Sequence, residues 1–197
     1  MSKPIILENL NGTDVVRFNR PEIRSPLSVA VLERLHDIVD AAAGPIIFTG
    51  TGDVFASGAD LREISRVTPE TAREFALRGQ TLMTKIANRE FPVIAAINGY
   101  CFGGALDLAL ACHRRIASPN AVFSHPGANL GIITGWGGTQ RLPLLIGQGR
   151  ALEMLFTARR VHASEALSIG LIDEITTNPL ESALNFAKSE PNLQTIS

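Results

Sequence analysis

The residues best suited to chemistry lie where an apolar strand gives way to an apolar helix. Gly103 and Gly104 separate the run 93–97, VIAAI, from the helix-like run 105–112, ALDLALAC. The first amides of a helix have no acceptor inside it, and the helix dipole adds partial positive charge at that end. An amide near Gly104 is therefore a candidate donor to a carbonyl oxygen that gains negative charge during a reaction.

Asp107 is the single acid of this helix and lies three residues after Gly104, on the same helix face. A carboxylate beside an oxyanion donor predicts proton transfer at a carbon next to an activated carbonyl. The spacing supports a second interpretation equally well, in which Asp107 only complements the positive end of the helix dipole.

A second glycine-bearing turn occurs at 54–64, VFASGADLREI. Its Ser57, Gly58 and Ala59 form a tight segment whose amides could supply a second donor. The local pattern alone favours an ordinary loop in which Asp60 caps the helix that follows.

A third cluster, SHPGANLGIITGWGGTQRLPLLIG, covers 124–147. Its interior, 130–134, is apolar enough to wall a pocket, and Trp136 is a candidate for the same wall. His125 has three interpretations: a base, a residue that orients another group, or a hydrogen-bonded core histidine, of which the last is the most common.

Other site classes find little support. Cys101 and Cys112 lie in the buried segment without CxxC or Cys/His ligand spacing, which predicts two reduced core thiols and no metal site. The glycines at 50 and 52 lack the third glycine of a dinucleotide-binding loop, and no phosphate-binding Gly-Lys-Ser/Thr occurs.

The elements that must position these residues alternate along the chain. A hairpin is predicted at 5–7 and 15–18, and further strands are predicted at 45–49, 93–97, 121–124 and 171–175. Helices are predicted at 28–43, 68–88, 105–112, 147–157 and 163–169, before a polar end. Such alternation predicts an α/β fold with mostly parallel strands covered by helices, and ligands in such folds meet the carboxyl ends of the strands.

Composition bounds the remaining possibilities. The chain has 197 residues, 45% of them hydrophobic, which is enough for one compact domain with a sizeable core. A formal net charge of −1 disfavours nucleic acid and anionic membranes as partners. The absence of a long apolar run and of a signal peptide predicts a cytoplasmic protein.

Taken together, four segments resemble the crotonase superfamily, also called the enoyl-CoA hydratase/isomerase family. They are FASGADL, PVIAAINGYCFGGALDLALAC, FSHPGANLGIITGWGGTQRLPLLIG and ALEMLFTARRVHASEALSIGLIDEI, and the match runs from about Ile6 to Pro179. The resemblance implies a spiral of strand-strand-helix units and a coenzyme A thioester as substrate. It also implies an oxyanion hole made by the amides of Ala59 and Gly104, which reverses the local interpretation of the 54–64 turn.

The resemblance carries further expectations about partners. It implies an acyl-CoA or enoyl-CoA thioester as ligand, with coenzyme A as part of the substrate, and no tightly bound cofactor. It implies a homo-oligomer, a trimer in most of the family, whose usual C-terminal trimerisation helices are largely absent from this single domain of residues 1–197. The positions that match coenzyme A contacts are Arg24, Ser57, Ala59, Asp60, Leu61 and Gly104.

The family's catalytic pair is only partly present. Its hydratases use two glutamates to hold and activate a water, and these positions fall on Asp107 and on Gly127, where the usual PE is PG. The resemblance therefore predicts a hydratase/isomerase-type enzyme of fatty acid metabolism, a lyase or an isomerase, with Asp107 as the proton-transfer residue. It disfavours unassisted two-carboxylate hydration. The alternative is an acyl-CoA-binding protein that has lost or altered its chemistry. Thr134, where some members carry an aspartate, is assigned a structural role.

Overall fold

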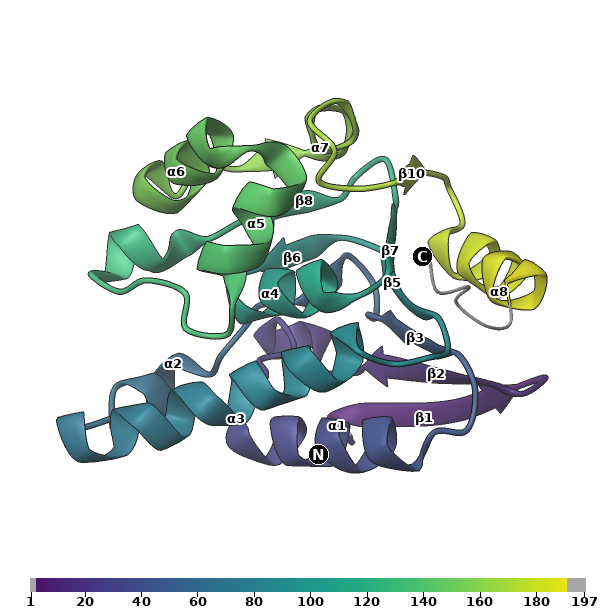
Figure 1. Cartoon of the computed structure of the whole chain (residues 1–197), viewed down its shortest axis with the longest axis horizontal. Coiled ribbons are helices and arrows are strands. Elements are labelled where there is room, and N and C mark those ends of the chain that lie inside the picture. The colour runs from purple at the N-terminus through teal and green to yellow at the C-terminus, as the bar shows by residue number, and fades with distance from the viewer. Residues whose placement is uncertain (1–2, 191–197) are drawn as a thin grey trace.

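The computed structural model describes residues 3–190, which form two sheets surrounded by helices (Figure 1). The strands are β1 (Ile5–Leu10), β2 (Thr13–Phe18), β3 (Ile46–Thr49), β4 (Val54–Ala56), β5 (Val93–Ile97), β6 (Tyr100–Phe102), β7 (Arg114–Ala117), β8 (Val122–Ser124), β9 (Val161–His162) and β10 (Glu174–Ile175). The α-helices are α1 (Val29–Ala41), α2 (Leu61–Ile64), α3 (Pro69–Ala87), α4 (Gly104–Ala111), α5 (Gly138–Ile146), α6 (Gln148–Thr157), α7 (Ala163–Ser168) and α8 (Pro179–Ser189).

The larger sheet has the order β1-β2-β3-β5-β7-β10. Its first two strands pair antiparallel, and the later pairs are parallel. Asn11 and Gly12 connect β1 to β2 with positive φ angles of 55° and 86°, which is the backbone that a tight hairpin turn requires. The predicted hairpin and the mostly parallel α/β fold are confirmed.

The smaller sheet has the order β4-β6-β8-β9, with β4, β6 and β8 parallel and β9 antiparallel to β8. Each of its first three strands directly follows a strand of the larger sheet, and helices follow each such pair. The chain thus repeats a strand-strand-helix unit three times, as the crotonase-like spiral requires.

Strand β5 is buried on both faces. Val93, Ala95 and Ile97 belong to the main core, which contains residues of α1, α3 and α4. Ile94 and Ala96 point to a smaller core beneath α8, a helix that packs against β3, β5 and β7 on the opposite side of the sheet (Figure 1).

The prediction of a polar end after residue 175 is wrong, because α8 covers the sheet with Leu180, Ala183, Leu184 and Ala187. These four residues have the spacing of one helix face. Four short strands, β4, β6, β7 and β9, are absent from the predicted elements because two to four residues are too few to show a period. Helix α5 is also missing from the predicted helices. It starts at Gly138 and contains Pro143, and both residue types are unfavourable in helices. The predicted strand 171–175 is paired only at Glu174–Ile175.

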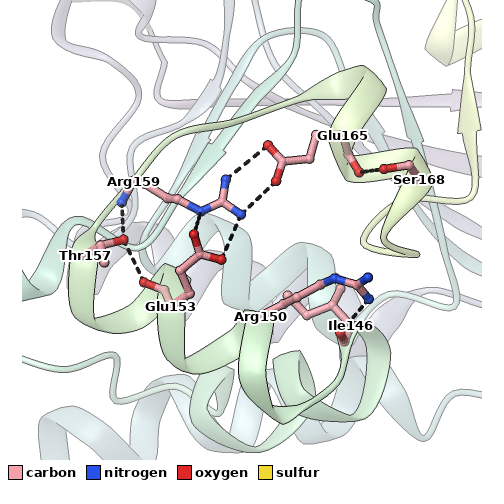
Figure 2. Close-up of polar contacts among 7 residues, drawn as sticks. All are labelled: Ile146, Arg150, Glu153, Thr157, Arg159, Glu165 and Ser168. Atoms are coloured by element: carbon pink, nitrogen blue, oxygen red, sulfur yellow. Dashed lines mark hydrogen bonds and ion pairs between the residues drawn. The ribbon is translucent and has the colours of Figure 1, made fainter.

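The far end of the smaller sheet is braced by ion pairs. Arg159 follows α6, and its guanidinium binds Glu165 of α7 at 2.7 and 3.0 Å and Glu153 of α6 at 2.9 Å (Figure 2). Ser124 Oγ donates to Ala158 O at 3.0 Å in the same segment. These contacts fix the end of β8, where the segment 125–136 begins.

Candidate active site

A cavity of about 350 Å³ lies between the start of α4, the 57–59 loop, helices α2 and α3, and the segment 125–136. Its lining is mostly apolar, with a small polar group at one end made by Asp107, His125 and Thr134. Apolar pockets with few convergent polar groups are the usual form of small-molecule sites. As predicted, Trp136 and most of the 130–134 run belong to its wall.

Helix α4 begins at Gly104, in the cavity wall, directly after Gly103 with φ 55° and ψ −125°. The Gly103 amide donates to Ser124 O at 2.9 Å, which ties this turn to the end of β8. Because Gly104 is the first residue of the helix, its amide has no acceptor within the helix. All seven following residues of α4 are buried, so the core holds this helix terminus in place.

The 57–59 loop lies against the start of α4. Leu27 N donates to Gly58 O at 2.7 Å, and a Cβ on Gly58 would stand 2.6 Å from the Gly104 nitrogen. Glycine, with φ 87° here, is what allows this close approach. The structure therefore brings Ala59 and Gly104, the two predicted donor positions, into one cavity wall.

Asp107 is 1% exposed and lines the same cavity one turn after Gly104. Burial raises the pKa of its carboxyl to about 7, while hydrogen bonds from the Thr134 hydroxyl and the Trp136 amide and the charge of Arg141 act in the opposite direction. Thr134 Oγ1 donates to Asp107 Oδ2. A carboxyl group that titrates near neutral pH can both accept and donate a proton.

His125 follows β8 and is 2% exposed, with its Nε2 atom 3.5 Å from Asp107 Oδ1. Burial lowers the pKa of this imidazole to about 4, so it is neutral at physiological pH. The first residue of α5, Gly138, gives the group room: a Cβ there would collide with Asp107 Oδ1 and stand 2.8 Å from Thr134 Cγ2 and 3.1 Å from His125 Cε1. Neither ring nitrogen of His125 has a hydrogen-bond partner among residues 3–190, so the described protein groups do not make it a hydrogen-bonded core residue.

Trp136 is 3% exposed and packs directly on two glycines from different helices. A Cβ on Gly104 of α4 or on Gly79 of α3 would overlap its indole ring. The Phe75 ring of α3 lies 6.2 Å from the indole, centroid to centroid. Sequence reasoning identified Trp136 but missed Phe75, whose only signal is its place on the apolar face of α3.

A family model described as enoyl-CoA hydratase/isomerase matches residues 8–186 of this sequence. The chain belongs to the enoyl-CoA hydratase/isomerase family.

Relatives and solved structures agree with this membership. The chain is 42% identical to a crotonyl-CoA hydratase of Syntrophomonas wolfei, over 87% of this chain and 68% of that protein. It is 38% identical to a short-chain-enoyl-CoA hydratase of Clostridium acetobutylicum, over 95% and 74%. Its structure matches an enoyl-CoA hydratase from Bacillus anthracis with a TM-score of 0.88 and 37% identity, covering 95% of this chain and 76% of that one. The structure of Pseudomonas aeruginosa DspI matches with a TM-score of 0.89 and 32% identity, over 95% and 80%.

Gly127, which the family resemblance matches to a second glutamate, also lines the cavity, in a short 3₁₀ turn after His125. The turn closes through Ile132 N, which donates to Gly127 O at 3.0 Å. A Cβ on Gly127 would stand 2.6 Å from Ile132 O, so the turn as folded excludes a side chain at this position.

The predicted coenzyme A positions divide into two groups. Ser57 and Leu61 line the cavity beside Ala59 and Gly104. Asp60 does not line it: its carboxylate caps α2 by accepting from Arg62 N at 2.9 Å, as the local pattern predicts, and Arg62 lowers its pKa. Arg24 also lies outside the cavity lining, with its side chain 59% exposed and paired with Asp53 at 3.4 Å.

Two further observations concern the described residues. Both cysteines are buried free thiols, as predicted, and burial raises the pKa of Cys112 to about 12. Within residues 3–190, no helix is long and apolar enough to cross a membrane, and no group of three potential metal-binding side chains occurs.

Proposed function

We propose that this chain is an enzyme that acts on acyl- or enoyl-CoA thioesters by way of their enolates. The observation that carries the proposal is the position of Asp107, a buried carboxyl with a pKa near 7, one turn from the exposed amide end of α4 in an apolar cavity. Asp107 moves the proton at the carbon next to the thioester carbonyl. The relatives named crotonyl-CoA and short-chain-enoyl-CoA hydratases support this substrate class.

The amides of Ala59 and Gly104 stabilise the negative charge that develops on the thioester oxygen. Removal of one such donor in other enzymes costs about 2.7 to 4 kcal/mol of transition-state stabilisation, because fixed donors in a dry site need no reorganisation. The mostly apolar lining suits an acyl chain.

Coenzyme A binds, in this proposal, as part of the substrate along the Ser57–Leu61 loop, whose Ser57 and Leu61 reach the cavity. Arg24 is available to its phosphates, since the guanidinium is largely exposed and its ion pair with Asp53 is a surface contact. A trimer of such chains stays a prediction from the family resemblance.

The test is the Asp107→Asn variant, which keeps the shape of the side chain and removes its proton chemistry. Two activities are measured: hydration of crotonyl-CoA, and exchange of the C2 protons of butyryl-CoA with deuterated solvent. We expect the variant to lose roughly 10²- to 10⁴-fold in kcat. Asp37→Asn, an exposed carboxylate of α1, is the matched control and keeps full activity. An Asp107→Asn enzyme with wild-type rates would refute the proposal.

The absence of a second carboxylate at Gly127 favours one alternative, a protein that binds acyl-CoA without turning it over. Micromolar binding of a coenzyme A thioester, with neither activity across a panel of acyl lengths, would establish that function in place of the first.

A further inference from the structure

His125 and Asp107 face each other at the polar end of the cavity. Among residues 3–190, neither ring nitrogen of His125 has a hydrogen-bond partner, and neither does Asp107 Oδ1. All three atoms are buried, and both residues line the cavity. Buried polar atoms are nearly always paired, so two that face each other without a partner, His125 Nε2 and Asp107 Oδ1 at 3.5 Å, indicate a polar ligand held between them.

The surrounding residues bury these atoms without giving them a hydrogen-bond partner. Thr134 binds the other carboxylate oxygen, Oδ2, and Gly138 provides the space in which the three side chains meet. Arg141 is the other titratable group that acts on the carboxyl, through its positive charge, and the carboxyl in turn helps to raise the pKa of the buried Cys101 thiol.

We propose that His125 is a second catalytic residue, which together with Asp107 holds the water that adds to the double bond of an enoyl thioester. The inference rests on the proposed function and specifies it as hydration. His125 thereby supplies the second water contact that Gly127 does not.

The chemistry of the pair fits this role. A neutral imidazole with its proton on Nδ1 presents Nε2 as an acceptor, and an ionised Asp107 presents Oδ1 as another. One water placed about 2.8 Å from each atom spans their 3.5 Å separation. Both of its hydrogens are then bound, and its oxygen lone pairs are left for the substrate.

The step balances with water as the sole co-reactant. Asp107 takes one proton from the water while the water oxygen forms a bond to C3 of the substrate. The C2=C3 electron pair moves onto the thioester and gives an enolate, which the Ala59 and Gly104 amides stabilise. Protonated Asp107 then returns its proton to C2, giving a 3-hydroxyacyl thioester and restoring the carboxylate.

The experiment separates water activation from proton transfer at carbon. Hydration of crotonyl-CoA needs the bound water, whereas C2 proton exchange of butyryl-CoA needs only Asp107 and the two amides. For His125→Leu we expect the hydration kcat to fall by about 100-fold. The rate of C2 proton exchange should fall by a factor at least about ten times smaller than the factor for hydration. The KM for crotonyl-CoA should stay within about threefold of the wild-type value.

A rescue variant and a control sharpen the test. His125→Gln places an amide oxygen near the position of Nε2 and should recover about tenfold in hydration over the leucine variant, whereas the shorter His125→Asn should not. If the His125→Leu variant does not fold, His125→Asn takes its place in the comparison of hydration with C2 proton exchange. Asp37→Asn, at the exposed carboxylate of α1, is the control and should keep both activities.

Each remaining outcome decides against the inference. Hydration by His125→Leu within about threefold of wild type overturns it, as does an equal loss of hydration and exchange. Wild-type protein that exchanges C2 protons but does not hydrate overturns this inference alone. Wild-type protein that does neither overturns the proposed function itself.

Discussion

The two walls of the cavity are held in place in different ways. The α4 wall, 104–111, is buried from its second residue onward, and the core fixes it on every side. The opposite wall, 126–136, is a glycine-bearing turn and loop with Leu130 half exposed and Ile133 64% exposed. It is held by its own turn bond from Ile132 N to Gly127 O, by Gln80 Nε2, which donates to Gly135 O at 2.8 Å, and by the side chains that it places on α3 and α4.

That difference assigns the walls separate tasks. The α4 wall supplies the groups whose position must not vary, Gly104 and Asp107. The loop wall contacts both of these residues: Thr134 binds the Asp107 carboxylate, and Trp136 packs on Gly104. Changes in the loop should therefore alter the chemistry of α4, while the fold of α4 should survive them.

The largest effect is expected from Trp136→Ala, which removes the main contact between the walls. Truncation of a buried tryptophan typically costs about 3 to 5 kcal/mol of unfolding free energy, because the surrounding side chains only partly refill the space. Urea unfolding measures the loss directly. A loss below about 1 kcal/mol would show that the loop wall holds itself without this contact.

The same contact can be probed from the other side. A methyl group on Gly104 would overlap the indole ring, so Gly104→Ala alone should cost about 1 to 3 kcal/mol through overpacking. In the double variant with Trp136→Ala the methyl has room. The double variant should then lose less unfolding free energy than the two single variants lose together. Full additivity of the two losses would contradict direct packing.

The next effect is a pH dependence that comes from α4 itself. The pKa of Asp107 is raised to about 7 in the folded chain from an ordinary value of 3.8. The folded state therefore binds more protons than the unfolded state between these values. The stability contributed by this group is complete below about pH 4 and is lost as the pH rises through about 7.

Relative to Asp107→Asn, the wild-type chain should lose about 3 kcal/mol of unfolding free energy between pH 5 and pH 8. Urea unfolding of both proteins at several pH values measures this difference. A constant difference over that range would mean that Asp107 keeps a single protonation state between pH 5 and pH 8, which would contradict a pKa near 7.

The smallest effect is expected from Thr134→Val, which keeps the side-chain volume and removes the hydroxyl bound to Asp107. A hydrogen bond to a charged group contributes roughly 1.5 kcal/mol or more, so the loss should appear mainly at pH 8, where the carboxyl is ionised. Because the hydroxyl lowers the pKa of Asp107, its removal should also raise that pKa further. In an Asp107→Asn background both effects should disappear, and their persistence would assign Thr134 a role in the loop alone.

The contrast between the walls also separates what could be predicted from sequence. The sequence alone identifies Gly104 and Asp107, because the strand, the glycine pair and the apolar helix that position them are adjacent along the chain and have recognisable local patterns. Ala59 was one of three candidate donors in the local pattern, which favoured an ordinary loop, and only the family resemblance selected it, since its importance depends on the 57–59 loop meeting α4. The His125 and Thr134 contacts to Asp107 join residues 18 and 27 positions apart along the chain, and no local pattern encodes them.

Elements of the fold follow the same rule. Long periodic segments such as α1 and α3 were predicted within about two residues, with Ser28 and Thr68 at their N-terminal caps. The short strands β4, β6, β7 and β9 and helix α8 were not, because their burial is decided by neighbours distant in sequence. The organisation as one domain and the oligomeric state stay predictions.

The turn at Gly127 bears on how such a site can evolve. One base change converts a glycine codon into a glutamate codon, yet here the new side chain would meet the Ile132 carbonyl of a closed turn. A carboxylate at position 127 therefore takes at least one further change in 127–132 that opens the turn. A single substitution alone does not readily place a second acid opposite Asp107.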